Sequence, residues 1–245
     1  MLIRYGEERD HRTDRRLACS LAAIAGALNT AAFHAVGFFS ANMTGNVSSL
    51  SDHIALGNVL KGAFFLGIVL IFIFGSTLST LLINAGRRRQ IDGIYAFSIL
   101  TEAILLGLLG WMDPRLSATA RGPVMILGLS FLMGLQNAVV TRISEARVRT
   151  THVSGMSTDI GIEIGMLIDV ARGREPRSEA GQLFRQLRLH GQTVLSFLAG
   201  GVVGVLVYRS VGSGLLIGAA AILFAIAMTG IMRLHLADDG VNEAG

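Results

Sequence analysis

The sequence predicts an all-α membrane protein with six transmembrane helices, arranged as two inverted three-helix repeats with glycine-broken polar segments. Three observations lead to this prediction: the composition, six apolar stretches, and a polar pattern that occurs twice. Of the 245 residues, 51% are hydrophobic and 16% are charged, whereas soluble domains are about 25% charged. Together with a mean hydropathy of +0.57, this favours a polytopic protein whose first partner is the lipid bilayer.

Six apolar stretches divide the chain. Each has few or no charges and is long enough to cross a hydrocarbon core about 30 Å thick, at about 1.5 Å per residue. They cover residues 17–39, 62–86, 93–112, 122–141, 191–208 and 210–232. We therefore expect a first repeat over 17–112, an external loop over 113–121 and a second repeat over 122–233. Residues 1–16 and 234–245 are predicted to be cytoplasmic tails.

The positive charges set the predicted topology. With a cytoplasmic N-terminus, all but four of the 21 Lys and Arg lie on the cytoplasmic side. The exceptions are Lys61, Arg115, Arg121 and Arg209. Because cytoplasmic loops carry an excess of Lys and Arg, both termini are predicted to be cytoplasmic. The net charge of +4 thus indicates topology and excludes nucleic acid as the expected partner.

A polar stretch interrupts the apolar pattern after the first segment. Residues 40–49 read Ser-Ala-Asn-Met-Thr-Gly-Asn-Val-Ser-Ser. Backbone groups at membrane depth must be hydrogen-bonded, so such a stretch is tolerated only where protein or a water-filled cavity surrounds it. Residues 150–159 repeat the pattern at an offset of 110, with Ser154 in the place of Thr44.

A second matched element precedes each polar stretch. Gly26-x-x-Asn29 corresponds to Gly134-x-x-Asn137 at an offset of 108. Two matched elements in the same order predict a duplication. Because each copy contains an odd number of spans, the two copies run through the membrane in opposite directions. The sequence leaves open whether the polar breaks re-enter the membrane or interrupt a span.

The segments outside the spans also have readable patterns. Residues 47–56 and 158–170 are predicted to form polar helices after the two breaks. Residues 182–189 alternate Leu or Phe with Arg at helical spacing, which is typical of a helix on an anionic cytoplasmic surface.

The two breaks together predict a binding site. In inverted-repeat transporters, discontinuous helices meet near the membrane midplane, where their N-termini attract anionic groups. Here the hydroxyls are expected to cap helix starts, and the glycines to permit a strained backbone and close approach. The candidate substrate-binding residues are Asn29, Asn42, Thr44, Gly45, Asn46, Asn137, His152, Ser154 and Gly155.

Acidic residues supply candidates for proton coupling. Glu102 is the one acidic residue deep in an apolar segment, and intramembrane carboxylates are costly enough to suggest a function. The alternative is a protonated side chain hydrogen-bonded to a neighbouring helix. His53 aligns with Glu163 in the other repeat, and here a solvated helix surface is the expected explanation.

These patterns favour a secondary transporter or permease for an unidentified small solute or ion. The alternative is a membrane scaffold or sensor without transport activity, for which Gly200, Gly201 and Gly204 offer a tight helix contact and a possible homo-oligomer. An enzyme is not expected. The chain has no His-Glu-x-x-His, no Gly-x-Ser-x-Gly and one cysteine, so no cofactor and no metal are predicted.

Three motifs resemble a known family. Residues 40–46 (SANMTGN), 133–138 (MGLQNA) and 150–155 (TTHVSG) are similar to the YoaK family of uncharacterised bacterial membrane proteins. Ser154 stands where that family usually has threonine, which keeps the hydroxyl. The resemblance implies a six-span protein of the bacterial inner membrane and names no substrate.

Overall fold

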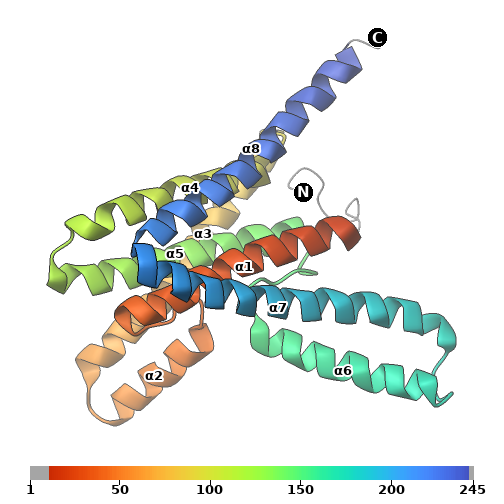
Figure 1. The fold of residues 1–245 in the computed structure, drawn as a ribbon, viewed down its shortest axis with the longest axis horizontal. Helices are drawn as coiled ribbons and strands as arrows, with labels where there is room; N and C mark the ends of the chain where they lie inside the picture. Colours follow the sequence, from red (N-terminus) through yellow and green to blue (C-terminus); the bar gives the residue numbers. More distant parts are fainter. Residues whose placement is uncertain (1–10, 243–245) are drawn as a thin grey trace.

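The computed structural model describes residues 11–242, and this part of the chain consists of helices and the segments that connect them, with no strand (Figure 1). The α-helices are α1 (His11–Val36), α2 (Met43–Ala55), α3 (Val59–Arg88), α4 (Ile94–Met112), α5 (Ala118–Ile143), α6 (Val153–Ala171), α7 (Ala180–Val211) and α8 (Gly214–Asn242). Two short 3₁₀ helices, η2 (Asp113–Arg115) and η3 (Arg177–Glu179), precede α5 and α7.

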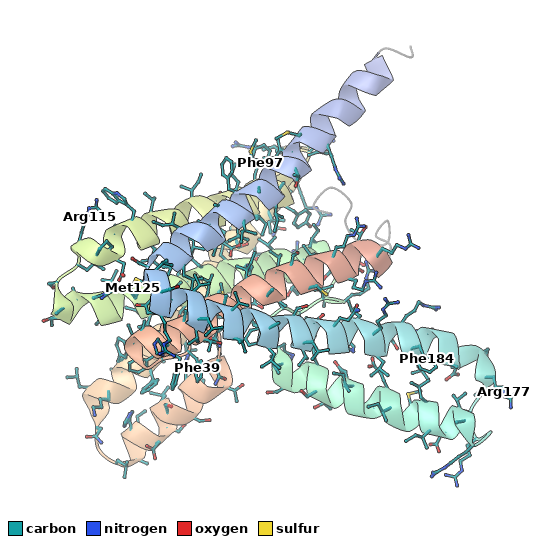
Figure 2. All side chains as sticks on the ribbon, in the orientation of Figure 1. Phe39, Phe97, Arg115, Met125, Arg177 and Phe184 are labelled. Carbon is teal, nitrogen blue, oxygen red and sulfur yellow. The ribbon has the colours of Figure 1, made fainter. Side chains whose placement is uncertain are left out.

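Six of these helices are long and apolar enough to cross a membrane, namely α1, α3, α4, α5, α7 and α8. Their outer faces carry large apolar side chains, and Figure 2 shows Phe97 and Phe184 pointing away from the ribbon. A soluble protein seldom exposes so much contiguous apolar surface. The prediction of an all-helical, multi-pass membrane protein is thereby confirmed.

The spans pack in three main pairs. Helix α1 packs on α7, α3 packs on α5, and α4 packs on α8. The other two α-helices form hairpins with the span that follows each of them, α2 with α3 and α6 with α7 (Figure 1). The buried centre is built largely from α1, α4 and α5, where Leu21, Leu28, Ile99 and Met133 are fully buried.

Glycines bring two of these pairs into backbone contact. A Cβ on Gly26 of α1 would overlap the carbonyl oxygen of Phe197 in α7. A Cβ on Gly134 of α5 would likewise overlap the carbonyl oxygen of Phe72 in α3. Small residues permit this close approach between membrane helices, where packing takes over from the hydrophobic effect as the cause of association.

The helices extend further than the apolar stretches predicted. Helix α1 begins at His11 and α8 continues to Asn242, so the expected tails over 1–16 and 234–245 are partly helical; residues 1–10 and 243–245 lie outside the described part. Residues 182–189 are helical and belong to α7, which continues from them into the fifth span. Helical hydrogen bonding does not stop where hydrocarbon stops, so hydropathy marks the membrane and not the helix ends.

Candidate functional site

Two asparagines on α1 and α5 hold the beginnings of the two short helices. Asn29 Oδ1 accepts a hydrogen bond of 2.8 Å from the backbone N–H of Ala41, just before α2. Asn137 Oδ1 accepts one of 2.8 Å from the hydroxyl of Thr151, just before α6. The matched Gly-x-x-Asn elements of the sequence therefore support the same local structure in both places.

The irregular segment that leads to α2 starts at a glycine. Gly37 has φ +79, a left-handed conformation that terminates helices and that L side chains rarely adopt. Helix α1 ends just before it, at Val36, and six residues separate Val36 from the first residue of α2, Met43. The side chain of Asn42 caps α2, because its Oδ1 accepts from the N–H of Gly45 at 3.1 Å.

The start of α6 is different, because its N-cap residue His152 makes no capping hydrogen bond. The ring instead faces an arginine, with Arg149 Nη1 3.2 Å from His152 Nδ1. A guanidinium can only donate, so Nδ1 is the acceptor and a neutral ring carries its proton on Nε2. The first-turn N–H groups of α6 are left without a side-chain cap.

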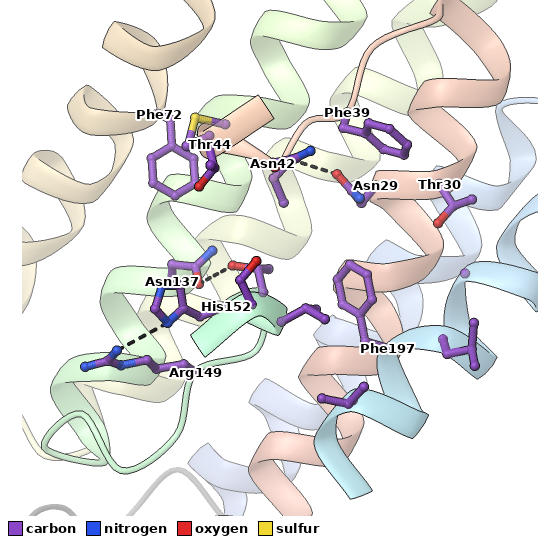
Figure 3. A pocket seen from close by; sticks show the side chains of 18 of the residues that line it. Asn29, Thr30, Phe39, Asn42, Thr44, Phe72, Asn137, Arg149, His152 and Phe197 are labelled. Atoms are coloured by element: carbon purple, nitrogen blue, oxygen red, sulfur yellow. Dashed lines mark hydrogen bonds between the residues drawn. The ribbon is translucent and has the colours of Figure 1, made fainter. Parts of the chain in front are cut away.

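Both helix starts open onto one cavity of about 1130 Å³ (Figure 3). Met43 and Thr44 from α2, and Val153 and Ser154 from α6, are among the residues that line it. Six of the nine predicted binding residues line this cavity, namely Asn29, Asn42, Thr44, Asn137, His152 and Ser154. Residues about 110 positions apart in sequence are thus brought together.

The rest of the lining is mainly apolar and was not predicted. Phe72 of α3 and Phe197, Leu198 and Val202 of α7 contribute much of it. A further repeat in the sequence is a signal for the aromatic pair, because Phe72-x-x-Gly75 recurs as Phe197-x-x-Gly200 at an offset of 125.

Arg149 also lines the cavity and was not predicted. It precedes His152 by three residues, in the segment between α5 and α6. Among the described residues that line the cavity, Arg149 is the one Lys or Arg, and none is Asp or Glu.

The other three predicted residues, Gly45, Asn46 and Gly155, are not among the residues that line the cavity. A Cβ on Gly45 would lie 2.5 Å from Asn42 Nδ2, and one on Gly155 would lie 2.5 Å from His152 Nδ1. Neither glycine has a positive φ, so the expected strained backbone is wrong. Each glycine leaves room for the side chain of its own N-cap residue. Asn46 is buried and donates from Nδ2 to the carbonyl of Phe39 at 3.3 Å.

Glu102 lies away from the cavity, in the interface between α4 and α5. It is fully buried, and its Oε1 accepts a hydrogen bond of 3.0 Å from Gln136 Nε2. Its Oε2 and the Oε1 of Gln136 have no partner among the described residues. Gln136 precedes Asn137 in the sequence, and Asn137 lines the cavity.

The second acidic candidate forms a buried pair between α6 and α7. Glu163 Oε1 lies 2.9 Å from His190 Nδ1, and the Glu163 side chain is 7% exposed. The expected solvated surface is wrong for Glu163, because α7 covers this face of α6. Burial raises the pKa of Glu163 above its ordinary value, although the neighbouring His190 partly lowers it. At the matching place in the other hairpin, His53 stacks on Phe65 with ring centroids 5.4 Å apart.

Comparison with known proteins identifies a family and no activity. The model of a family described as "Protein of unknown function (DUF1275)" matches residues 17–229. No curated protein and no solved structure matches the chain. Among the described residues, no three His, Cys, Asp or Glu gather as a metal site would require.

Proposed function

We propose that this chain, which belongs to the DUF1275 family of proteins of unknown function, is a permease for a small solute or ion. The observation that carries this proposal is the cavity onto which the starts of α2 and α6 both open. Sites of this kind, built where two short helices begin inside a bundle of longer ones, are how many secondary transporters bind their solutes. A cavity of about 1130 Å³ holds a small organic molecule.

An inverted duplication is part of the proposal. With α1–α4 matched to α5–α8, the α1/α7 pair corresponds to α5/α3, and the α2/α3 hairpin corresponds to α6/α7. The contacts match in detail, because Gly26 lies against the backbone carbonyl of Phe197 as Gly134 lies against that of Phe72. The two asparagine bonds that hold the helix starts match in the same way.

The short helices are proposed to re-enter the membrane from opposite sides. Figure 1 shows α2 running from the middle of the molecule towards the lower left and α6 towards the lower right. The 13 residues of α2 extend about 20 Å, which is too short for a core of about 30 Å. Helix α6 has 19 residues, as many as α4, but it contains Asp159, Glu163 and Asp169 and is not among the helices apolar enough to cross a membrane. The excess of Arg near the N-terminus and between α5 and α7 supports cytoplasmic termini, and we assign the protein to the bacterial inner membrane.

The scaffold alternative receives less support from the packing. The glycines that it would use for assembly are occupied within the chain, since a Cβ on Gly200 or Gly204 would overlap Ala23 or Ala27 of α1. Replacing them would therefore disturb the fold of one subunit before any association.

A solute-binding screen with a blocked cavity tests the proposal. Ser154→Trp places a large ring in the cavity, whereas Ser157→Trp is the matched control, one turn further along α6, exposed and outside the lining. Purified protein is heated with ions, organic acids, amino acids, nucleobases and sugars. A solute at 100 times its Kd adds about 2.7 kcal/mol to the folded state.

We expect at least one solute to stabilise the wild type and Ser157→Trp but not Ser154→Trp. Solutes that stabilise all three proteins equally, or no stabilising solute for a well-folded wild type, would count against the permease.

A further inference from the structure

The three asparagines that line the cavity share one property, in that each side-chain oxygen already accepts a hydrogen bond within the protein. Asn29 Oδ1 accepts from Ala41 N–H, Asn42 Oδ1 from Gly45 N–H, and Asn137 Oδ1 from the Thr151 hydroxyl. The orientation of Asn29 and Asn42 is fixed, because only the oxygen can accept from a backbone N–H. Asn137 is fixed by its Nδ2, which donates to the carbonyl of Met133.

A side-chain donor of the cavity is left without an acceptor in the protein and is available to a ligand. Asn29 is 7% exposed and lines the cavity, yet its Nδ2 donates to no group among the described residues, although its Oδ1 is bonded. Figure 3 shows this amide on the cavity side of α1. Because Asn29 lines the cavity, this Nδ2 can donate a hydrogen bond to an acceptor on a bound ligand.

The cavity also carries positive charge, which attracts the same kind of ligand group as the N–H donors do. Arg149 lines it and no acidic side chain does so among the described residues. The uncapped start of α6 adds its free N–H groups and the positive end of its helix dipole. Most of the remaining wall is apolar and includes Phe72, Phe197 and Val202.

From these observations we propose that the solute is an organic anion with an apolar body. Its charged group binds at the start of α6, next to Arg149, and its apolar part lies against Phe72 and Phe197. This inference rests on the proposed permease function and names the solute class of the same cavity.

Matched pairs of probes test the charge separately from the shape. Benzoate is compared with benzamide, and benzenesulfonate with benzenesulfonamide, by equilibrium binding to the full-length protein in lipid nanodiscs. The members of each pair are nearly equal in size and differ in charge. We expect each anion to bind at least about tenfold more tightly than its neutral partner, as one charge-assisted hydrogen bond supplies.

Variants of one arginine provide the second arm. Arg149→Gln should remove the preference for the anion, and Arg149→Lys should keep part of it. Arg142→Gln is the control, since Arg142 bonds to Asn84 at 2.7 Å outside the cavity lining, and it should leave the preference unchanged.

Three results would overturn the inference. Neutral probes that bind as tightly as the anions would refute the charge preference, even if Ser154→Trp still blocks them and the permease therefore stands. An anion preference that survives Arg149→Gln would place the charged group elsewhere. Equal competition by chloride and by benzoate would refute the role of the apolar wall. Failure of the wider solute screen, in contrast, would reject the permease itself.

Discussion

The close contact between α5 and α3 makes a quantitative prediction for Gly134→Ala. The added methyl group would overlap the carbonyl oxygen of Phe72, and a backbone carbonyl in a helix cannot rotate away. The two helices must therefore separate, which for an overpacked core costs about 1–3 kcal/mol. The higher helix propensity of alanine offsets at most about 1 kcal/mol of this cost.

Gly67→Ala in α3 is the matched control, because its Cβ would meet no atom within 4 Å. It should be neutral or more stable than the wild type by up to about 1 kcal/mol. Both variants are unfolded by heat and by denaturant in detergent micelles. If the two halves are equivalent, Gly26→Ala, which overlaps Phe197 in the same way, should cost about as much as Gly134→Ala. Equal stability of Gly134→Ala and Gly67→Ala would refute this description of the interface.

Two further predictions concern the short helices. Asn42→Ala removes the cap of α2 and should lower the unfolding free energy by about 0.5–2 kcal/mol. The ring of His152 makes no capping hydrogen bond, so His152→Ala should lower it less in the same denaturation assay. An equal loss of stability in the two variants would contradict the assigned caps. The raised pKa of Glu163 means that the folded state binds this proton more tightly than the unfolded state. The stability of the wild type relative to Glu163→Gln should therefore fall as the pH rises from the ordinary value of 4.5 through the raised pKa, and a rise across that window in melting-temperature measurements would contradict it.

Hydropathy was sufficient to predict the six long helices, because twenty apolar residues have few alternatives in a bilayer. It was insufficient for their ends. Asp14 shows why, since it is nearly buried and pairs with Arg147 at 3.0 Å, a contact across 133 residues that makes the charged start of α1 part of the folded structure.

Internal repetition predicted six residues of the cavity lining, because a duplicated Asn holds a duplicated helix start in the structure. It did not predict that Gly45 and Gly155 accommodate the N-cap side chains, and a contact of these glycines with solute stays a prediction. Sequence spacing reports that two residues are equivalent without indicating what either one touches.

The partners of the buried acids could not be predicted either. Gln136 reaches Glu102 from α5, and His190 reaches Glu163 from α7. Each partner lies on a different helix from the acid, and the sequence alone does not show which helices pack against each other. The proton-coupling role of Glu102 stays a prediction, and its burial next to Gln136 also fits the alternative of a protonated, hydrogen-bonded side chain.

Solute uptake into proteoliposomes measures transport itself, and the cavity between α2 and α6 is proposed to be the transport site. Thr44→Trp and Ser154→Trp fill it from opposite halves of the chain, while Thr77→Trp and Ser157→Trp are exposed controls outside the lining. We expect both cavity variants to lose uptake of the solute found in the screen and both controls to keep it. Uptake that persists in Thr44→Trp and Ser154→Trp would show that the solute does not pass through this cavity.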